Sequence, residues 1–273
     1  MLLLCGGGRL AAYREKWDRV PCPLASPELL AASGPRLACV DNTNHALWMG
    51  GRTVAAESGI EAALWWRDCL LTLSGDTDCL TLIGPGGEML LTTPAGIYPQ
   101  DMCLLPGGNA VAVAGGADGR VHCIRLPSLT DAGSLSLPGN VQRVAFGGGA
   151  LYALCALEDD GLRCLLCRVP LGGGQYRALA LWPGLPGAVH VDGRGTLWAA
   201  ASERLCRLGR SGGVEEVQGD FGLIRHMDSH GETLLVSDPV LEALSLVQGG
   251  RQTIVREGGV QHGIFRYNAA LKA

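Results

Sequence analysis

The sequence predicts an all-β protein, a seven-bladed β-propeller whose blades are four-stranded antiparallel sheets. Three observations predict this fold. An apolar strand followed by an acidic turn recurs along the chain, a second strand-like segment precedes each recurrence by about ten residues, and Gly is abundant at 41 of 273 residues. Four short strands in about 40 residues is the period of a propeller blade.

The recurring unit is an apolar strand that ends in a polar tight turn. Asp, Asn and Gly favour such turns because they tolerate left-handed backbone angles and hydrogen-bond to their own backbone. The acidic residues at these turns are spaced 35 to 44 residues apart, at Asp41, Asp76, Asp118, Asp159, Glu203 and Asp238.

A second segment precedes each of these strands and is expected to be the first strand of its unit. Gly-rich turns such as residues 106–108 and 147–149 connect it to the strand that follows. The expected first strands are residues 27–31, 61–65, 100–104, 141–146, 188–191 and 224–227.

The units divide the chain, taken as one propeller domain of residues 1–273, into six blades and two leftover ends. Residues 260–273 contain one strand-like segment, 261–267, and residues 1–25 contain the pieces of three more. We expect both ends to share a seventh blade, because pairing them removes a free sheet edge. A ring of six blades is the alternative. The predicted blades are 26–59, 60–96, 97–139, 140–184, 185–220, 221–259, and 260–273 joined with 1–25.

Charge and hydropathy exclude two classes of partner. The net charge is −4, and the basic residues are spread along the chain without a basic run, so we expect no nucleic-acid partner. No segment approaches the roughly 20 apolar residues of a membrane helix. The first residues, 1–6, resemble a lipoprotein signal only faintly and are expected to form a strand. We therefore expect no association with a membrane.

The chain has 11 Cys, and several of them lie within apolar runs. Without an export signal, reduced thiols in a cytoplasmic protein are the simplest account. Cys164 and Cys167 have the spacing of a redox or zinc motif. However, they lie in an expected strand, where residues three apart point to opposite faces. We interpret them as structural, and we expect Trp65, Trp66 and Trp182 to pack between blades.

Two segments resemble a known propeller family. In residues 98–114 a strand that begins with Pro99 is followed by the Gly107-Gly108 turn and an apolar strand. This segment resembles the YVTN/lactonase-like propeller repeat, and residues 188–198 are similar to it and to NHL-type repeats. No unit carries a Gly-His opening with a closing Trp-Asp, the hallmarks of WD40 repeats. The resemblance implies the propeller fold and, more weakly, lactone chemistry, because its relatives include sugar-lactone hydrolases.

Polar residues recur at the expected exposed end of each first strand, which lines the channel of a propeller. We expect them to converge from all seven blades, although a one-residue shift of register would turn any of them away. The set is Glu28, Glu61, Asp101, Arg143, His190, His226 and His262, with Arg225 and Gln261 beside the last two.

Three interpretations of this set stay open. The residues could be the ordinary polar wall of a wet channel. They could bind a small polar or anionic molecule, with Arg143, Arg225 and the histidines as donors. They could also form a metal or acid–base site, since three imidazoles and a carboxylate are able to hold a divalent ion.

The expected function is a cytoplasmic binding or interaction module, active as a monomer, whose partner is a protein or a small polar or anionic ligand. The alternative is a lactonase-like or other small-molecule enzyme with its site in the central channel. No cofactor is clearly implied. The sequence contains no Gly-x-Ser-x-Gly elbow and no Walker loop, so catalytic residues stay unassigned.

Overall fold

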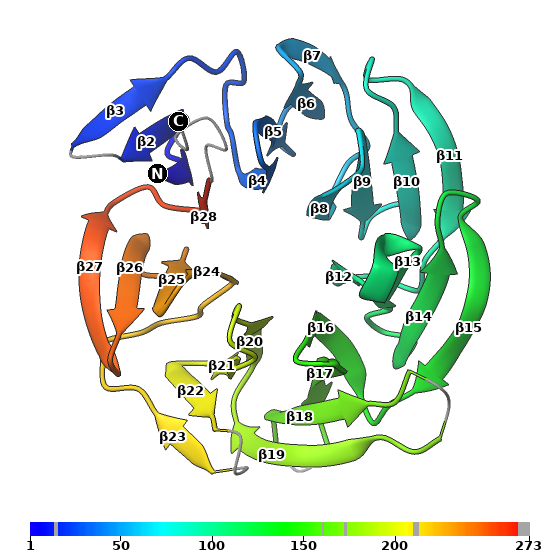
Figure 1. Cartoon of the computed structure of the whole chain (residues 1–273), viewed down its shortest axis with the longest axis vertical. Coiled ribbons are helices and arrows are strands. Elements are labelled where there is room, and N and C mark those ends of the chain that lie inside the picture. Colours follow the sequence, from blue (N-terminus) through cyan, green and yellow to red (C-terminus); the bar gives the residue numbers. More distant parts are fainter. Residues whose placement is uncertain (14–15, 160, 172–173, 210–212, 267–273) are drawn as a thin grey trace.

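The computed structural model describes residues 1–13, 16–159, 161–171, 174–209 and 213–266. These residues form seven four-stranded antiparallel sheets arranged as a ring (Figure 1). The predicted seven-bladed propeller is therefore confirmed. In each blade the first strand lies innermost and the fourth lies at the rim.

The first three blades follow the order of the chain. The first contains β4 (Leu29–Ser33), β5 (Arg36–Asp41), β6 (Ala46–Met49) and β7 (Arg52–Ala55). The second contains β8 (Ile60–Trp66), β9 (Cys69–Ser74), β10 (Cys79–Ile83) and β11 (Met89–Pro94). The third contains β12 (Asp101–Leu104), the short 3-10 turn η1 (Pro106–Gly108), β13 (Ala110–Ala114), β14 (Arg120–Arg125) and β15 (Thr130–Ser136).

The next three blades repeat this pattern. The fourth contains β16 (Asn140–Gly147), β17 (Ala150–Leu157), β18 (Arg163–Val169) and β19 (Arg177–Pro183). The fifth contains β20 (Pro186–Val191), β21 (Leu197–Ala201), β22 (Arg204–Leu208) and β23 (Val214–Glu216). The sixth contains β24 (His226–His230), β25 (Thr233–Asp238), β26 (Ala243–Gln248) and β27 (Arg251–Glu257).

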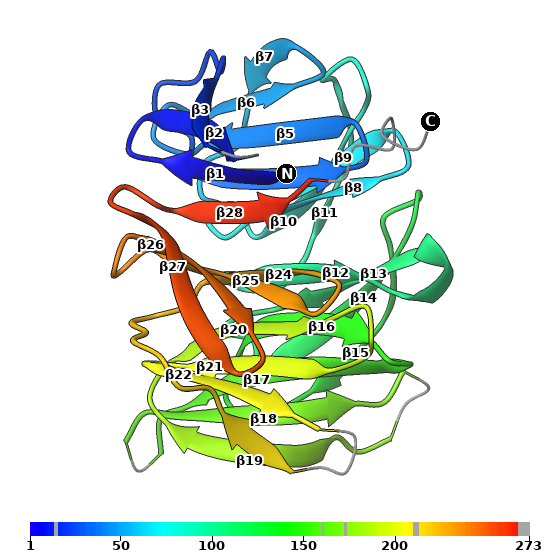
Figure 2. The same ribbon diagram turned by 60° about the vertical axis from the view of Figure 1, so that its left-hand side comes forward.

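The seventh blade joins the two ends of the chain. β28 (His262–Phe265) pairs with β1 (Leu2–Gly6), and β2 (Arg9–Tyr13) and β3 (Trp17–Val20) complete the sheet. Figure 2 shows β28 alongside β1. Tyr267, the predicted end of the last strand, lies outside the described residues. The composite blade closes the ring, as the sequence predicts.

The middle strands are apolar on both faces because each blade packs between two others. All five residues of β21 are buried, whereas the rim strand β11 is mostly exposed. Seven apolar clusters of described residues fill the ring, each formed mainly by neighbouring blades. Cys167 packs in the cluster between the third and fourth blades and Cys164 in the next one, so they face opposite sides of β18. These two thiols are therefore not placed to form a disulfide with each other or to bind one zinc ion together.

The tryptophans singled out in the sequence also pack between blades. Trp66 and Trp182 are 6% and 8% exposed and belong to inter-blade clusters. Trp65 is partly buried, and its indole Nε1 donates to the carbonyl of Ala31 in the first blade at 3.1 Å. These side chains hold blades together and do not form an exposed aromatic surface.

The acidic turn residues organise the ends of the second strands. Asp238 accepts hydrogen bonds from the backbone N–H groups of Val240 and Leu241 in its own turn, and from that of Gly222 in the preceding loop. Asp41 in the first blade has the same role, with bonds from Asn44 and Ser26. One carboxylate thus holds both the turn after the second strand and the loop that precedes the first strand of the same blade.

Two predicted first strands begin two residues later than expected. The expected strand 27–31 corresponds to β4 at Leu29–Ser33, and the expected strand 224–227 corresponds to β24 at His226–His230. Ile224 and Phe221 instead fill the apolar cluster between the fifth and sixth blades, at 0% and 5% exposure, from the loop before the strand. A loop whose apolar residues fill the core cannot be distinguished from a strand by its composition.

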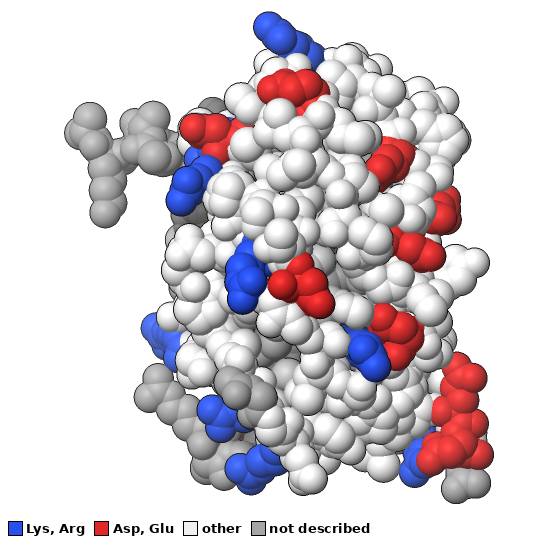
Figure 3. Space-filling view, turned by 90° about the vertical axis from the view of Figure 1, so that its right-hand side faces the viewer, with Lys and Arg blue, Asp and Glu red and all other residues white. Residues whose placement is uncertain are grey.

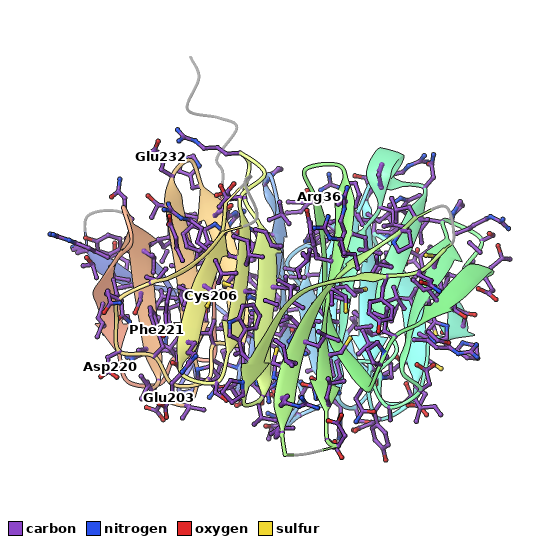
Figure 4. All side chains as sticks on the ribbon, turned by 90° about the horizontal axis from the view of Figure 1, so that it is seen from below. Arg36, Glu203, Cys206, Asp220, Phe221 and Glu232 are labelled. Carbon is purple, nitrogen blue, oxygen red and sulfur yellow. The ribbon has the colours of Figure 1, made fainter. Side chains whose placement is uncertain are left out.

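The two flat faces of the ring can be told apart by labelled residues in Figure 4, where Glu203 and Asp220 lie on one side and Glu232 and Arg36 on the other. Glu203 follows β21, whose Ala201 pairs with Pro186, the first residue of β20. Glu232 follows His230, the last residue of β24. Innermost strands therefore start at the Glu203 face and end at the Glu232 face. Within the described part of the chain, no helix is long and apolar enough to cross a membrane.

Candidate functional site

The innermost strands surround a cavity of about 530 Å³. This volume lies in the range of about 300–1,000 Å³ that small-molecule sites occupy. Most polar residues of its wall gather where the strands start, toward the Glu203 face, whereas His190 is the fifth of the six residues of β20 and lies toward the other end. The polar residues of the wall include Glu28, Asn42, Glu61, Gln100, Asp101, Arg143, His190, Arg225, His226, Gln261 and His262, so every residue of the predicted set lines the cavity.

Several of these side chains link the inner edge of one blade to the next. An innermost strand has a free edge whose backbone N–H groups need acceptors. Asp101 Oδ2 accepts from the N–H of Val144 at 3.0 Å, and His262 Nδ1 accepts from the N–H of Leu30 at 3.0 Å. In both pairs the partner belongs to the following blade. Asp101 and His262 therefore help to hold neighbouring blades together.

Asp228 makes a third link of this kind, which the sequence analysis missed. Asp228 lies within β24, and its Oδ2 accepts from the N–H of Phe265 in β28 at 2.7 Å. No local pattern identifies it, because its partner is 37 residues away in another blade.

Burial changes the acidity of Asp101. Removal from water raises its pKa to about 6, against the opposing effects of the Arg143 guanidinium and of hydrogen bonds from the N–H groups of Val144 and Met102. A carboxyl group with this pKa changes its protonation state near neutral pH. Such a group can take up or release a proton during a reaction.

Arg143 is 7% exposed and spans three blades. Its Nε donates to the carbonyl of Gly187 at 2.8 Å, and its Nη1 donates to the carbonyls of Gln142 at 2.8 Å and Gln100 at 3.4 Å. Among the described residues, Nη2 has no hydrogen-bond acceptor. Burial lowers the pKa of this guanidinium, although Asp101 opposes the shift. The carbonyl contacts orient the group, and one amino group is left for the cavity.

Arg225 and Glu61 differ from these structural residues. Both line the cavity, and no described residue forms a hydrogen bond or ion pair with either side chain. Partial removal from water raises the pKa of Glu61, while Arg143 and Arg225 act in the opposite direction. The two arginines are therefore near enough to Glu61 to interact with it electrostatically across the cavity.

The three predicted histidines do not meet at one point. The rings of His226 and His262 stack with their centroids 3.9 Å apart. His190 Nε2 instead lies 2.8 Å from the hydroxyl of Ser229. Ser229 is three residues beyond His226 in β24, or roughly 10 Å of strand. In the described part of the chain, no group of three or more His, Cys, Asp or Glu residues could hold a metal ion.

The stacked histidines are neutral at pH 7. Burial lowers the pKa of His262 to about 3, and burial, followed by the charges of its neighbours, lowers the pKa of His226 well below 6.5. Because Nδ1 of His262 accepts a backbone hydrogen bond, the proton of its neutral ring is on Nε2. His262 thus keeps a donor free for a molecule in the cavity.

Charge is segregated around the channel. Glu28, Glu61 and Asp101 come from the first three blades, whereas Arg143 and Arg225 come from the fourth and sixth. The outside of the ring differs. On the side face in Figure 3, charged groups of both signs are dispersed over a largely uncharged surface. The channel wall therefore combines an acidic side and a basic side within one small cavity.

The fold and the lined channel define the chain as a seven-bladed β-propeller. No family model and no curated protein sequence matches it. The resemblance to YVTN/lactonase-like and NHL repeats therefore stays a prediction.

Solved structures share the fold at low sequence identity. The chain is similar to hydrazine synthase of Kuenenia stuttgartiensis, with a TM-score of 0.71 and 13% identity over 87% of this chain and 80% of that one. It is also similar to a protein from Lactobacillus plantarum, with a TM-score of 0.70 and 14% identity over 96% and 97% of the two chains. A streptogramin B lyase has a TM-score of 0.63 and 11% identity over 89% and 85%. Such likeness shows the fold alone.

Proposed function

We propose that this propeller is a binding module that takes a small anionic molecule into its channel at the Glu203 face. One observation carries the proposal: Arg225 lines the cavity without a hydrogen-bond or ion-pair partner among the described residues. A guanidinium is a strong donor to carboxylate and phosphate groups. An unpaired one in a cavity of ligand size is suited to bind such a group.

Two neighbours of Arg225 support the same role. The guanidinium of Arg143 is held by three backbone carbonyls, so its free Nη2 is oriented before a ligand arrives. His226 lies near both arginines, which help to keep its ring neutral. A neutral ring can hydrogen-bond to an anion without adding a charge that must be removed from water.

A thermal-shift screen with citrate, succinate, phosphate and hexanoate, followed by calorimetric titration, tests the proposal. We expect at least one of these anions to raise the melting temperature, because a ligand at 100 times its Kd stabilises by about 2.7 kcal/mol. In Arg225→Gln, the affinity for that anion should fall at least about tenfold. The fold should persist, since Arg225 makes no side-chain bond within the described protein.

The matched control is Arg52→Gln, which removes an exposed arginine from the rim strand β7. It should leave the affinity unchanged. Absence of binding by all four anions would overturn the proposal, and so would equal loss of affinity in both variants, because the effect would then reflect overall charge.

An enzyme of lactonase-like type is the second candidate, and Asp101 is the observation that favours it. A carboxyl group with a pKa of about 6 in the cavity wall could activate water for attack on a lactone. Proton release from γ-butyrolactone, measured with a pH indicator, tests this function. Hydrolysis that exceeds the uncatalysed rate and is lost in Asp101→Asn would support it, and the uncatalysed rate alone would exclude it for this substrate.

We further propose that the protein functions in the cytoplasm. All 11 cysteines lie in the described chain and are free thiols. Free thiols in this number are typical of a reducing compartment.

A further inference from the structure

Resting on the proposed function, we infer that the ligand is a zwitterion that carries a carboxylate at one end and an ammonium group at the other. Arg225 and Arg143 bind the carboxylate, and Glu61 binds the ammonium group. Each step of this assignment follows from charges and contacts that line the cavity.

On the acidic side of the cavity, one carboxylate has no hydrogen-bond or ion-pair partner among the described residues. Glu28 accepts hydrogen bonds from the hydroxyls of Thr43 and Ser26, and Asp101 accepts two backbone N–H groups. Glu61 has no hydrogen-bond or ion-pair partner among the described residues. It is therefore the acidic group available to an ammonium donor.

The basic side lies across the channel from Glu61. In Figure 1, β8, which carries Glu61, is on the opposite side of the ring centre from β24, which follows Arg225 directly in the chain. Although these charges attract one another, they form no direct ion pair. A molecule with opposite charges at its two ends can satisfy both groups at once, whereas a simple anion leaves Glu61 unpaired and faces its repulsion.

Part of the cavity wall is apolar and partly exposed, which suits an apolar spacer. Ala62, Ala63 and Met227 line the same cavity and are only partly buried. A methylene chain between the ammonium and carboxylate groups would contact these side chains and lose water. This arrangement favours an ω-amino carboxylic acid or a molecule with the same spacing over a compact α-amino acid.

Titration with glycine, β-alanine, 4-aminobutanoate, 5-aminopentanoate and 6-aminohexanoate at pH 7.5 tests the inference. Affinity should rise to an optimum at one chain length, where both ends reach their partners. At that length the amino acid should bind at least about tenfold more tightly than the unsubstituted carboxylate with the same number of carbons, because it gains a charge-assisted contact.

Variants separate the two ends of the ligand. In Glu61→Gln, the preference for the amino acid over the carboxylate should disappear while carboxylate binding persists or improves. In Arg225→Gln, both ligands should lose affinity. Glu203→Gln, which removes an exposed acid from the same face, is the control and should keep the preference.

The possible failures are distinguishable. If carboxylates bind through Arg225 but the amino group adds nothing, the zwitterion is wrong and the anion-binding function stands. If neither carboxylates nor amino acids bind, both proposals are wrong. Equal binding of the corresponding alkylamine would also overturn the inference, because the site would then recognise cations alone.

Discussion

At the scale of single residues, the channel wall contains two kinds of polar side chain. Asp101 and His262 accept backbone N–H groups of the next blade, whereas Arg225 and Glu61 have no such partner among the described residues. The sequence predicts that all four line the channel, because each lies at or beside the expected exposed end of an innermost strand. The sequence cannot predict which of these side chains hydrogen-bond to other residues of the protein. The partner of His262 is 232 residues away, and the contact depends on how two blades are positioned relative to each other.

The residue whose titration should affect stability most clearly is His262. Its pKa of about 3 in the folded protein lies below the ordinary 6.5, so its neutral form stabilises the fold above about pH 6.5. This contribution is lost progressively as the pH falls from 6.5 toward 3. At pH 5 the loss is about 2 kcal/mol, since one pKa unit corresponds to about 1.36 kcal/mol.

We predict that His262→Asn loses less stability between pH 7.5 and pH 5 than the natural protein, by about 2 kcal/mol. The Asn side-chain oxygen can still accept the N–H of Leu30, so the variant should fold. Urea unfolding at the two pH values measures the difference. His45→Asn, at an exposed turn, is the control. Equal acid losses in the natural protein and in His262→Asn would contradict the assignment.

The raised pKa of Asp101 acts in the opposite direction. Its contribution to stability is present below about pH 4 and is lost as the pH rises through about 6. Acidification therefore increases the contribution of Asp101 to stability and decreases that of His262. The pH profile of the natural protein contains both effects, so the His262→Asn variant is needed to isolate that of His262.

At the scale of elements, β28 holds the ring closed through three neighbours. All four of its residues pair with residues of β1. In the sixth blade, Ser237 Oγ and Asp228 Oδ2 accept the N–H groups of Gly263 and Phe265 at 2.9 and 2.7 Å. Toward the first blade, His262 accepts the N–H of Leu30. A four-residue strand thus links both ends of the polypeptide to the ring.

Deletion of residues 260–273 should open the ring. It removes β28 and the buried side chains of Val260 and Ile264, and it exposes an edge of β1. We expect aggregation or a fall in melting temperature of more than about 10 °C, since 1 kcal/mol corresponds to about 2–4 °C in a chain of this size. Differential scanning calorimetry measures it.

A shorter deletion of residues 267–273 keeps β28 and is the control for loss of the end of the chain. If both truncated proteins melt like the full chain, β28 does not close the ring.

The sequence could predict the blades because the periodicity of turns is a local property. Polar turn residues such as Asp41 and Asp238 bond to backbone groups within a few residues, so their spacing gives the repeat directly. The start of β24 could not be predicted in the same way. Ile224 is completely buried by contacts with another blade, and nothing in its immediate neighbours distinguishes it from a strand residue.

At the scale of the whole molecule, the cysteines are distributed through the ring and not gathered in one site. Cys5, Cys39, Cys155, Cys164, Cys167 and Cys206 are buried, and the other five are partly buried. Burial raises the pKa of Cys206 to about 11 and that of Cys164 to about 12, so these thiols stay protonated. Protonated, buried thiols react slowly.

We predict that all 11 thiols react with a thiol reagent after denaturation without reductant. In the native protein, the six buried cysteines should react much more slowly than the others, because the ring must open to expose them. Mass spectrometry of the alkylated protein counts both groups. Fewer than 11 reactive thiols after denaturation would indicate native disulfides and would contradict the proposed cytoplasmic location.

The central claim is that the cavity between the innermost strands binds a small molecule through Arg225. The most direct test is a crystal structure of the protein saturated with the tightest ligand of the carboxylate and amino-acid series. The account predicts density for the ligand in the channel, with its carboxylate about 2.7–3.2 Å from nitrogen atoms of Arg225 and Arg143. Density on the rim of the ring, or in the channel at His190 and away from Arg225, would contradict it.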